Sequence, residues 1–97
     1  FQEYVRAADL RQDDIALQLK AGQFLLLAAR FDEARGKAQR VLDRDPRHAQ
    51  AHLLLGNAWA GLKNYDESVR ILNQAIDADP NHGMARAALA AVEAVRG

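Results

Sequence analysis

Cysteine is absent from this chain of 97 residues, which contains only two prolines, six glycines and one tryptophan. Without cysteine the chain can form no disulfide and has no thiolate nucleophile, and its redox compartment is not encoded. The scarcity of proline and glycine leaves few points at which a helix must end. Hydrophobic residues make up 49% of the chain, which excludes a disordered segment and favours a helical, globular one.

A surplus of either charge is also missing, because 13 basic residues are balanced by 13 acidic ones. A surface without net positive charge releases few counterions from a nucleic-acid backbone, so the balance argues against DNA or RNA as a partner. The same balance gives no support to binding at an anionic membrane surface. We therefore expect a protein or peptide partner, no nucleic acid and no membrane insertion.

Long hydrophobic runs are lacking too. No run is longer than Phe24 to Ala29, which is far shorter than a bilayer-spanning helix requires. No secretory signal pattern opens the chain, and its first residue is Phe1 rather than Met. We interpret this start as one whose natural beginning was removed or lies upstream, and the sequence assigns no cell compartment.

The strongest positive signal is an internal repeat with a period of 34 residues. The dipeptide Asp45-Pro46 recurs as Asp79-Pro80 at this offset. Further identical pairs keep the same register without a gap: Leu19 and Leu53, Gly22 and Gly56, Asp32 and Asp66, His48 and His82. The chain is therefore expected to contain two copies of one structural unit.

Each unit has the hydrophobic pattern of two helices, which we predict over residues 15–28 and 32–44, and again over 52–62 and 66–78. The first helix of each unit is apolar on two sides and must be covered on both or left open to a ligand. The second has one apolar stripe and one charged face that includes Lys37, as expected for an outer helix. Asp32 and Asp66 are predicted to cap the outer helices, and Pro46 and Pro80 to end them.

Three segments, LGNAW at 55–59, NYDES at 64–68 and AIDADP at 75–80, resemble the consensus of the tetratricopeptide repeat (TPR) family. The resemblance implies an all-α fold, a right-handed α-α superhelix (TPR solenoid) of antiparallel helix pairs. It places the outer helix of a preceding repeat and a junction at 1–14, whole repeats at 15–48 and 49–82, and the inner helix of a partial repeat, or a capping helix, at 83–97.

The resemblance also implies small residues where paired helices cross, with Gly22 against Ala34 and Gly56 against Ser68. The consensus aromatic residue in the first turn is replaced here by Gln18, and in the next repeat by His52. This departure is expected to loosen the packing between repeats. For Gly36, inside an outer helix, close packing is the one explanation that the sequence suggests.

Inner helices of TPR proteins line a concave groove that usually receives a peptide or a helix. Carried over by register, the resemblance implies a peptide-binding groove built from Leu19, Lys20, Gln23, Leu26, Gln50, Leu53, Asn57 and Met84. One TPR subtype grips chaperone C-terminal carboxylates with several cations. Those cations are mostly absent here, so we expect a mildly apolar groove whose ligand is an amphipathic helix or apolar peptide rather than a chaperone carboxylate.

Two other interpretations of the apolar groove positions stay open. These residues are core or are covered by other parts of a longer TPR protein, which would make the segment a structural spacer without a ligand of its own. Alternatively, the apolar inner face or the alanine-rich C-terminal helix mediates homo-oligomerisation, because a terminal repeat should be polar outside.

Residues with catalytic or metal-binding potential have simpler explanations. His48 and His52 share the spacing of some zinc ligands but have no third ligand nearby in sequence, so we interpret them as a turn residue and a helix-start residue. Adjacent carboxylates on a helix do not face one another. We expect no cofactor, no metal and no enzyme activity.

Overall fold

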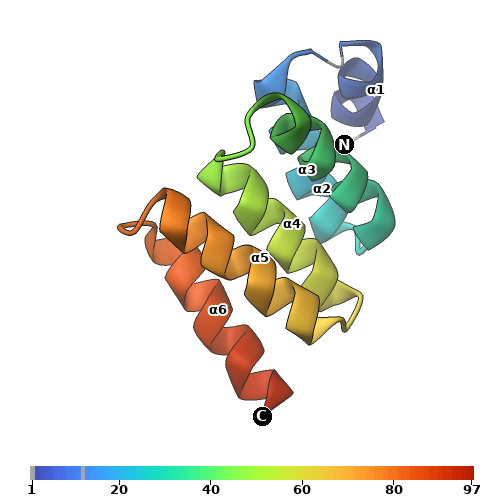
Figure 1. The fold of residues 1–97 in the computed structure, drawn as a ribbon. Coiled ribbons are helices and arrows are strands. Elements are labelled where there is room, and N and C mark those ends of the chain that lie inside the picture. The colour runs from blue at the N-terminus through green and yellow to red at the C-terminus, as the bar shows by residue number, and fades with distance from the viewer. Residues whose placement is uncertain (1, 12) are drawn as a thin grey trace.

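The computed structural model describes residues 2–11 and 13–97, which fold into helices joined by short loops. Six α-helices follow one another in the described part: α1 (Gln2–Leu10), α2 (Ile15–Leu27), α3 (Phe31–Arg44), α4 (Ala49–Gly61), α5 (Tyr65–Ala78) and α6 (Gly83–Arg96) (Figure 1). The predicted all-α class is confirmed. The helix predicted from residue 52 begins three residues earlier, at Ala49. Within these residues no helix combines the length and apolar character needed to cross a bilayer.

Histidine side chains cap two of the three inner helices. His48 precedes α4 and its Nδ1 accepts a hydrogen bond from the Ala51 amide over 3.2 Å. His82 repeats this contact with Ala85 at the start of α6, also over 3.2 Å. Asp14 caps α2 in the same place. The prediction of His48 as a turn residue therefore missed that it satisfies an otherwise unpaired amide of the first helical turn.

The predicted caps of the outer helices are wrong. Asp32 and Asp66 lie inside the first turns of α3 and α5, where they face the positive end of the helix dipole but do not accept the capping hydrogen bond. Asn64 caps α5 by accepting from the Glu67 amide over 3.3 Å. Arg30 occupies the cap position of α3 and makes no side-chain cap. The helices begin one residue earlier than predicted, which moves each aspartate past the capping position.

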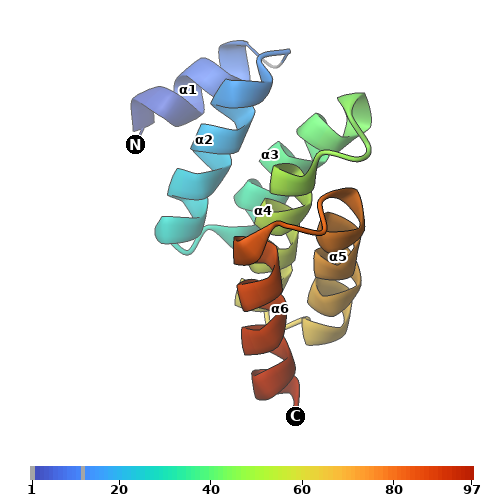
Figure 2. The same ribbon diagram turned by 90° about the vertical axis from the view of Figure 1, so that its left-hand side faces the viewer.

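The helices form two layers. Each helix packs against the next one in the chain, and in addition α2 contacts α4 and α4 contacts α6, whereas the fully described helices α3 and α5 do not contact each other. Helices α2, α4 and α6 therefore lie closer together than the outer helices, which curves the stack and makes their side the concave one. Figure 2 shows α2 at the left, with α6 in front of α4.

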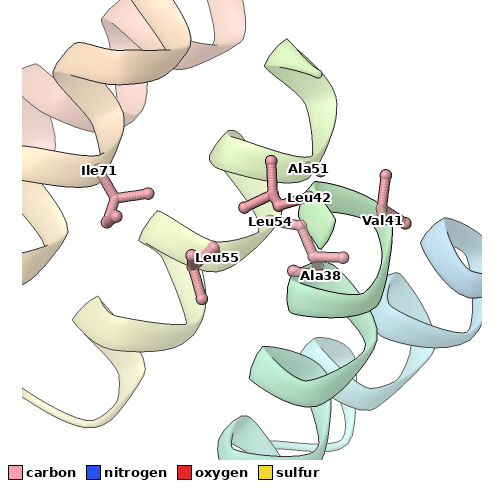
Figure 3. Close-up of a cluster of buried hydrophobic side chains, with 7 residues drawn as sticks. All are labelled: Ala38, Val41, Leu42, Ala51, Leu54, Leu55 and Ile71. Carbon is pink, nitrogen blue, oxygen red and sulfur yellow. The ribbon is translucent and has the colours of Figure 1, made fainter. Parts of the chain in front are cut away.

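A buried cluster ties the two repeats together. It consists of Ala38, Val41, Leu42, Ala51, Leu54, Leu55 and Ile71 (Figure 3). Its members come from α3, α4 and α5, so α4 is held between an outer helix of its own repeat and one of the preceding repeat. The apolar stripe predicted for the first outer helix is confirmed, since Ala38 is fully buried and Val41 is 1% exposed.

Three glycines allow helices to approach closely, and at one of them, Gly61, a Cβ would lie 2.3 Å from the Phe31 ring of α3. A Cβ built at Gly56 would lie 2.7 Å from Leu72 of α5, and one built at Gly22 would lie 2.4 Å from Leu54 of α4. The predicted meeting of Gly56 and Ser68 is confirmed by a 2.8 Å hydrogen bond from the Ser68 hydroxyl to the Gly56 carbonyl. Beside Gly22, however, the nearest side chain is that of Leu54 in the next repeat rather than Ala34.

The polar residues in place of the consensus aromatic do not leave the junctions loose. Gln18, 1% exposed, donates its amide to the carbonyl of Ala8 over 2.7 Å. The His52 Nε2 lies 2.9 Å from the Pro46 carbonyl. Arg86, one period further on, donates from Nε to the Pro80 carbonyl over 2.8 Å. Each of the three register-equivalent side chains thus hydrogen-bonds a backbone carbonyl in the segment preceding its own helix.

Lys37 lies on the packed side of α3, so its predicted place on the solvated face is wrong. It is 7% exposed and its ammonium group forms an ion pair with Asp9 of α1. The hydrogen bond from Lys37 lowers the pKa of the Asp9 carboxyl below its ordinary value of 3.8, against a smaller opposing effect of burial. Asp9 therefore holds α1 against α3 through its charged form.

The first prediction concerns Gly36, whose Cβ position is open, with no atom within 4 Å. Close packing is thus not its explanation. We expect Gly36→Ala to raise the free energy of unfolding by about 1 kcal/mol, because alanine costs less conformational entropy in a helix. Gly56→Ala is the matched control and should lower it by roughly 1–3 kcal/mol, because Leu72 must move. Urea denaturation followed by circular dichroism measures both free energies of unfolding. If the two variants change this free energy in the same direction, the conclusion that Gly36 has open space and Gly56 does not is wrong.

The second prediction concerns the pH dependence of the Asp9 ion pair. Because its pKa is lower in the folded state, its contribution is present above the ordinary carboxyl value of 3.8 and is lost as the pH falls through the lower folded-state value. We expect the stability difference between the wild type and Asp9→Asn to be constant near neutral pH and to vanish in strong acid. Thermal melts across an acidic pH series test this, and a difference that persists at the acid extreme would refute it.

Candidate functional site

A hollow of about 330 Å³ opens on the concave side of the inner helices. Its lining comes from α2, α4 and α6: Gln23, Leu26, Leu27, Gln50, Leu53, Leu54, Asn57 and Met84. Two of these side chains are unusually exposed for apolar residues, Leu27 at 84% and Met84 at 67%. They come from opposite ends of the inner layer, α2 and α6, so an apolar ligand would contact all three inner helices at once.

Six of the eight residues proposed for the groove line this hollow together. The other two do not. Leu19 packs against the buried cluster of α3, α4 and α5, and Lys20 is exposed on α2 outside the lining. Sequence reasoning missed Leu27 and Leu54. Leu27 is the last residue of α2, where the end of the helix leaves its large apolar side chain uncovered. The run of three leucines at 25–27 is the sequence feature that could have indicated an apolar contribution from this residue.

Leu53 forms the floor of the hollow rather than a free contact surface. It is 3% exposed and packs in a second buried cluster with Leu72, Ala75, Ala85 and Val92. This cluster joins α4, α5 and α6. A charged substitution at Leu53 would therefore act on the stability of the fold, and it cannot serve as a selective probe of the hollow.

The polar groups of the lining are amides. Gln23 and Asn57 make no hydrogen bond to another described residue, and both are partly or fully exposed. The Gln50 Oε1 lies 3.1 Å from Nε2 of His82, which links α4 to the start of α6. Since an amide group can both donate and accept, these side chains match the N–H and C=O groups of a peptide backbone.

No charged residue belongs to the lining of this hollow. A carboxylate transferred from water into it would lose hydration without gaining an ionic partner, which is unfavourable. The arrangement therefore suits uncharged and apolar groups. It lacks the cation set that would hold an acidic peptide tail.

A second, larger depression of about 410 Å³ lies on the opposite side, between α3 and α5. Its floor includes Leu55 and Trp59 of α4, and the Arg35 guanidinium lies 4.3 Å from the centre of the Trp59 ring. Its walls carry the intrahelical ion pairs of Arg35 with Asp32 and of Arg70 with Glu67. These charges are already neutralised by their neighbours, as is usual on a solvated helix face.

In the part of the chain that the structure describes, six helices alternate between an inner and an outer layer and repeat every 34 residues around a concave hollow, which defines a helical-repeat solenoid. The family model for the tetratricopeptide repeat matches residues 19–83. The chain belongs to the tetratricopeptide repeat family. A search of curated proteins gives no significant match.

Solved structures share the fold. The TPR domain of Arabidopsis OM64 is 20% identical, with a TM-score of 0.82 over 92% of this chain and 74% of that domain. The first TPR of Spaghetti (RPAP3), bound to the HSP90 peptide SRMEEVD, is 16% identical, with a TM-score of 0.84 over 97% of this chain and 75% of that chain. YrrB, a TPR protein with an unusual peptide-binding site, is 30% identical, with a TM-score of 0.82 over 88% of this chain and 44% of that chain. The chain thus spans less than half of YrrB. The fold, with neighbours that bind peptides, supports a protein-interaction scaffold.

The third prediction compares a buried lining residue of the hollow, Leu53, with an exposed one, Leu27. We expect Leu53→Ala to lower the free energy of unfolding by roughly 2–5 kcal/mol, because it leaves a cavity between α4, α5 and α6. Leu27→Ala should change it by no more than about 0.5 kcal/mol, because the side chain is exposed. Chemical denaturation compares the two directly. Similar losses for both variants would show that Leu27 is packed in solution.

Proposed function

We propose that the chain is a protein-interaction scaffold whose concave hollow binds an uncharged, apolar segment of a partner protein. The observation that carries this proposal is the pairing of exposed apolar side chains with unengaged amides. Leu27 and Met84 flank the hollow, while Gln23 and Asn57 have no described hydrogen-bond partner. Exposed apolar surface of this kind is uncommon unless it is used for binding.

The ligand suited to this surface differs from those of two structural neighbours. The first TPR of Spaghetti is bound to the HSP90 peptide SRMEEVD, and the second TPR domain of human RPAP3 to the HSP70 peptide SGPTIEEVD. Both peptides end in the sequence EEVD, which has three acidic side chains. Because the lining here has no cation, and Lys20 lies outside it, we propose that chaperone C-terminal carboxylates are not its ligands.

A binding role rather than catalysis agrees with the state of the carboxylates. Five of the six side chains in the adjacent acidic pairs have a structural role within or between helices: Asp14 caps α2, Asp32 pairs with Arg35, Glu33 with Arg30, Asp66 with Arg96 and Glu67 with Arg70. We therefore propose an interaction module that is not an enzyme.

The alternative function is that of a structural spacer or oligomerisation segment. The observation in its favour is α6, whose outward side exposes Ala90, Ala94 and Val95, the last of them at 65%. The register equivalent of Ala90 is Gly56, which α5 covers in the preceding repeat. An uncovered face of this composition could associate with a second copy through close helix packing.

The fourth prediction tests binding in the hollow. A displayed library of random peptides is screened on the chain, and recovered peptides are remade with blocked ends. We expect uncharged apolar sequences, whose affinity falls about tenfold or more in Leu27→Asp and in Asn57→Ala. Leu10→Asp is the matched control, since Leu10 is 81% exposed at the end of α1 and outside the hollow. Isothermal titration measures the affinities.

Two results would contradict this proposal. One is the selection of acidic peptides such as SRMEEVD, which would show that the absence of lining cations does not decide specificity. The other is equal binding by the wild type and both hollow variants. Light scattering of the wild type and of Val95→Asp tests the alternative, because a concentration-dependent dimer that Val95→Asp abolishes would favour oligomerisation through α6.

A further inference from the structure

His82 makes two hydrogen bonds, in one of which its ring must accept a hydrogen and in the other donate one. Its Nδ1 lies 3.2 Å from the backbone nitrogen of Ala85, where it caps α6. Its Nε2 lies 3.1 Å from Oε1 of Gln50 on α4. The first contact joins the residue before α6 to the first turn of that helix, whereas the second reaches across to the lining of the hollow.

The first bond determines the direction of the second. A backbone N–H is always a donor, so the His82 Nδ1 that faces Ala85 must be an unprotonated acceptor. In a neutral imidazole the other nitrogen then carries the hydrogen. The His82 Nε2–H therefore donates, and the Gln50 atom that faces it must be the carbonyl oxygen.

This fixes which way the Gln50 amide points. With its oxygen turned toward His82, its NH₂ group is the part left for the hollow, so Gln50 offers a ligand chiefly its donors. Gln23 and Asn57 have no such constraint, since neither is hydrogen-bonded to another described residue. The hollow thus has one amide of set polarity and two that can adapt.

We propose that His82 is a positioning residue that orients Gln50 as a donor, and that the hollow selects segments presenting an acceptor, namely a backbone carbonyl, at this position. The inference rests on the proposed function and deepens it, by naming the group that the ligand must present. It also gives the helix cap a second role, because the same imidazole places Met84 at the start of α6 and sets the polarity of Gln50 on α4.

The repeat supplies an internal control. His48, one period earlier, caps α4 through the Ala51 amide in the same way. The residue one period before Gln50 is Ala16, which has no side-chain acceptor. The two histidines therefore share the capping role, and only His82 has an amide of the hollow to orient.

The test begins with the ring itself. Long-range ¹H–¹⁵N spectra of the ¹⁵N-labelled chain at neutral pH should show His82 as the Nε2–H form. The Nδ1–H form would overturn the proposal without any ligand, because the imidazole could then neither cap Ala85 nor donate to Gln50.

Binding is then measured with a blocked peptide recovered from the random library. In His82→Asn the asparagine oxygen still caps α6, but the side chain ends short of Gln50. We expect the affinity to fall about three- to tenfold, as for the loss of one pre-oriented group, with thermal stability largely kept. Gln50→Glu keeps the acceptor for His82 but presents an anionic oxygen in place of NH₂, and should weaken binding at least about tenfold.

The matched variant His48→Asn should leave the affinity within about twofold of the wild type. His48 caps a helix in the same way but has no glutamine side chain of the hollow to orient. Equal binding by the wild type, His82→Asn and Gln50→Glu would overturn the role of His82 while leaving the hollow as the binding site. A library peptide whose affinity is also unchanged in Leu27→Asp would instead remove the hollow itself as the site, and the failure would then lie with the proposed function.

Discussion

The close approach of helices at Gly22 and Gly56 sets the spacing on which the rest of this structure depends. At each glycine a leucine side chain occupies the space where a Cβ would otherwise lie, Leu54 beside Gly22 and Leu72 beside Gly56. The first contact joins the inner helices of neighbouring repeats, and the second joins the two helices of one repeat. The first brings α2 close to α4 within the inner layer, and the second brings α5 close to α4.

Polar contacts at the junctions then determine how each helix is rotated and where it begins. Gln18, His52 and Arg86 stand one period apart and each hydrogen-bonds a carbonyl in the segment before its helix. Asp14, His48 and His82 likewise stand one period apart and cap the same helices. Because a buried carbonyl without a partner is costly, the buried bond from Gln18 to Ala8 in particular favours one arrangement of α1 and α2 over others.

The distribution of charge separates the two faces of the molecule. On the outer helices, acidic and basic residues neutralise one another at short range, as Asp32 does with Arg35. The concave hollow has no charge in its lining and keeps exposed apolar groups instead. This separation leaves the outer face well solvated and makes the inner face the one where burial by a partner removes apolar surface from water.

The sequence by itself determined the repeat, the class of each helix and most of the hollow. A 34-residue period and alternating one-sided and two-sided apolar patterns depend only on local spacing, so they can be read along the chain. Six of the eight lining residues follow from register for the same reason. That these residues bind a peptide remains a proposal, since neither period nor register carries information about a partner.

Only the tertiary structure decided which side chains with the same local pattern are buried, paired or free. Lys37 lies on a face that looks solvated along α3, but α1 covers it from 28 residues away. Leu53 and Leu27 are both inner-helix leucines, yet α5 and α6 bury one and nothing in the described chain covers the other. His82 reads as a junction residue until α4 brings Gln50 to it. The physical reason is common to all three, because burial and hydrogen bonding are properties of neighbours in space, and these neighbours lie on helices that local sequence does not place.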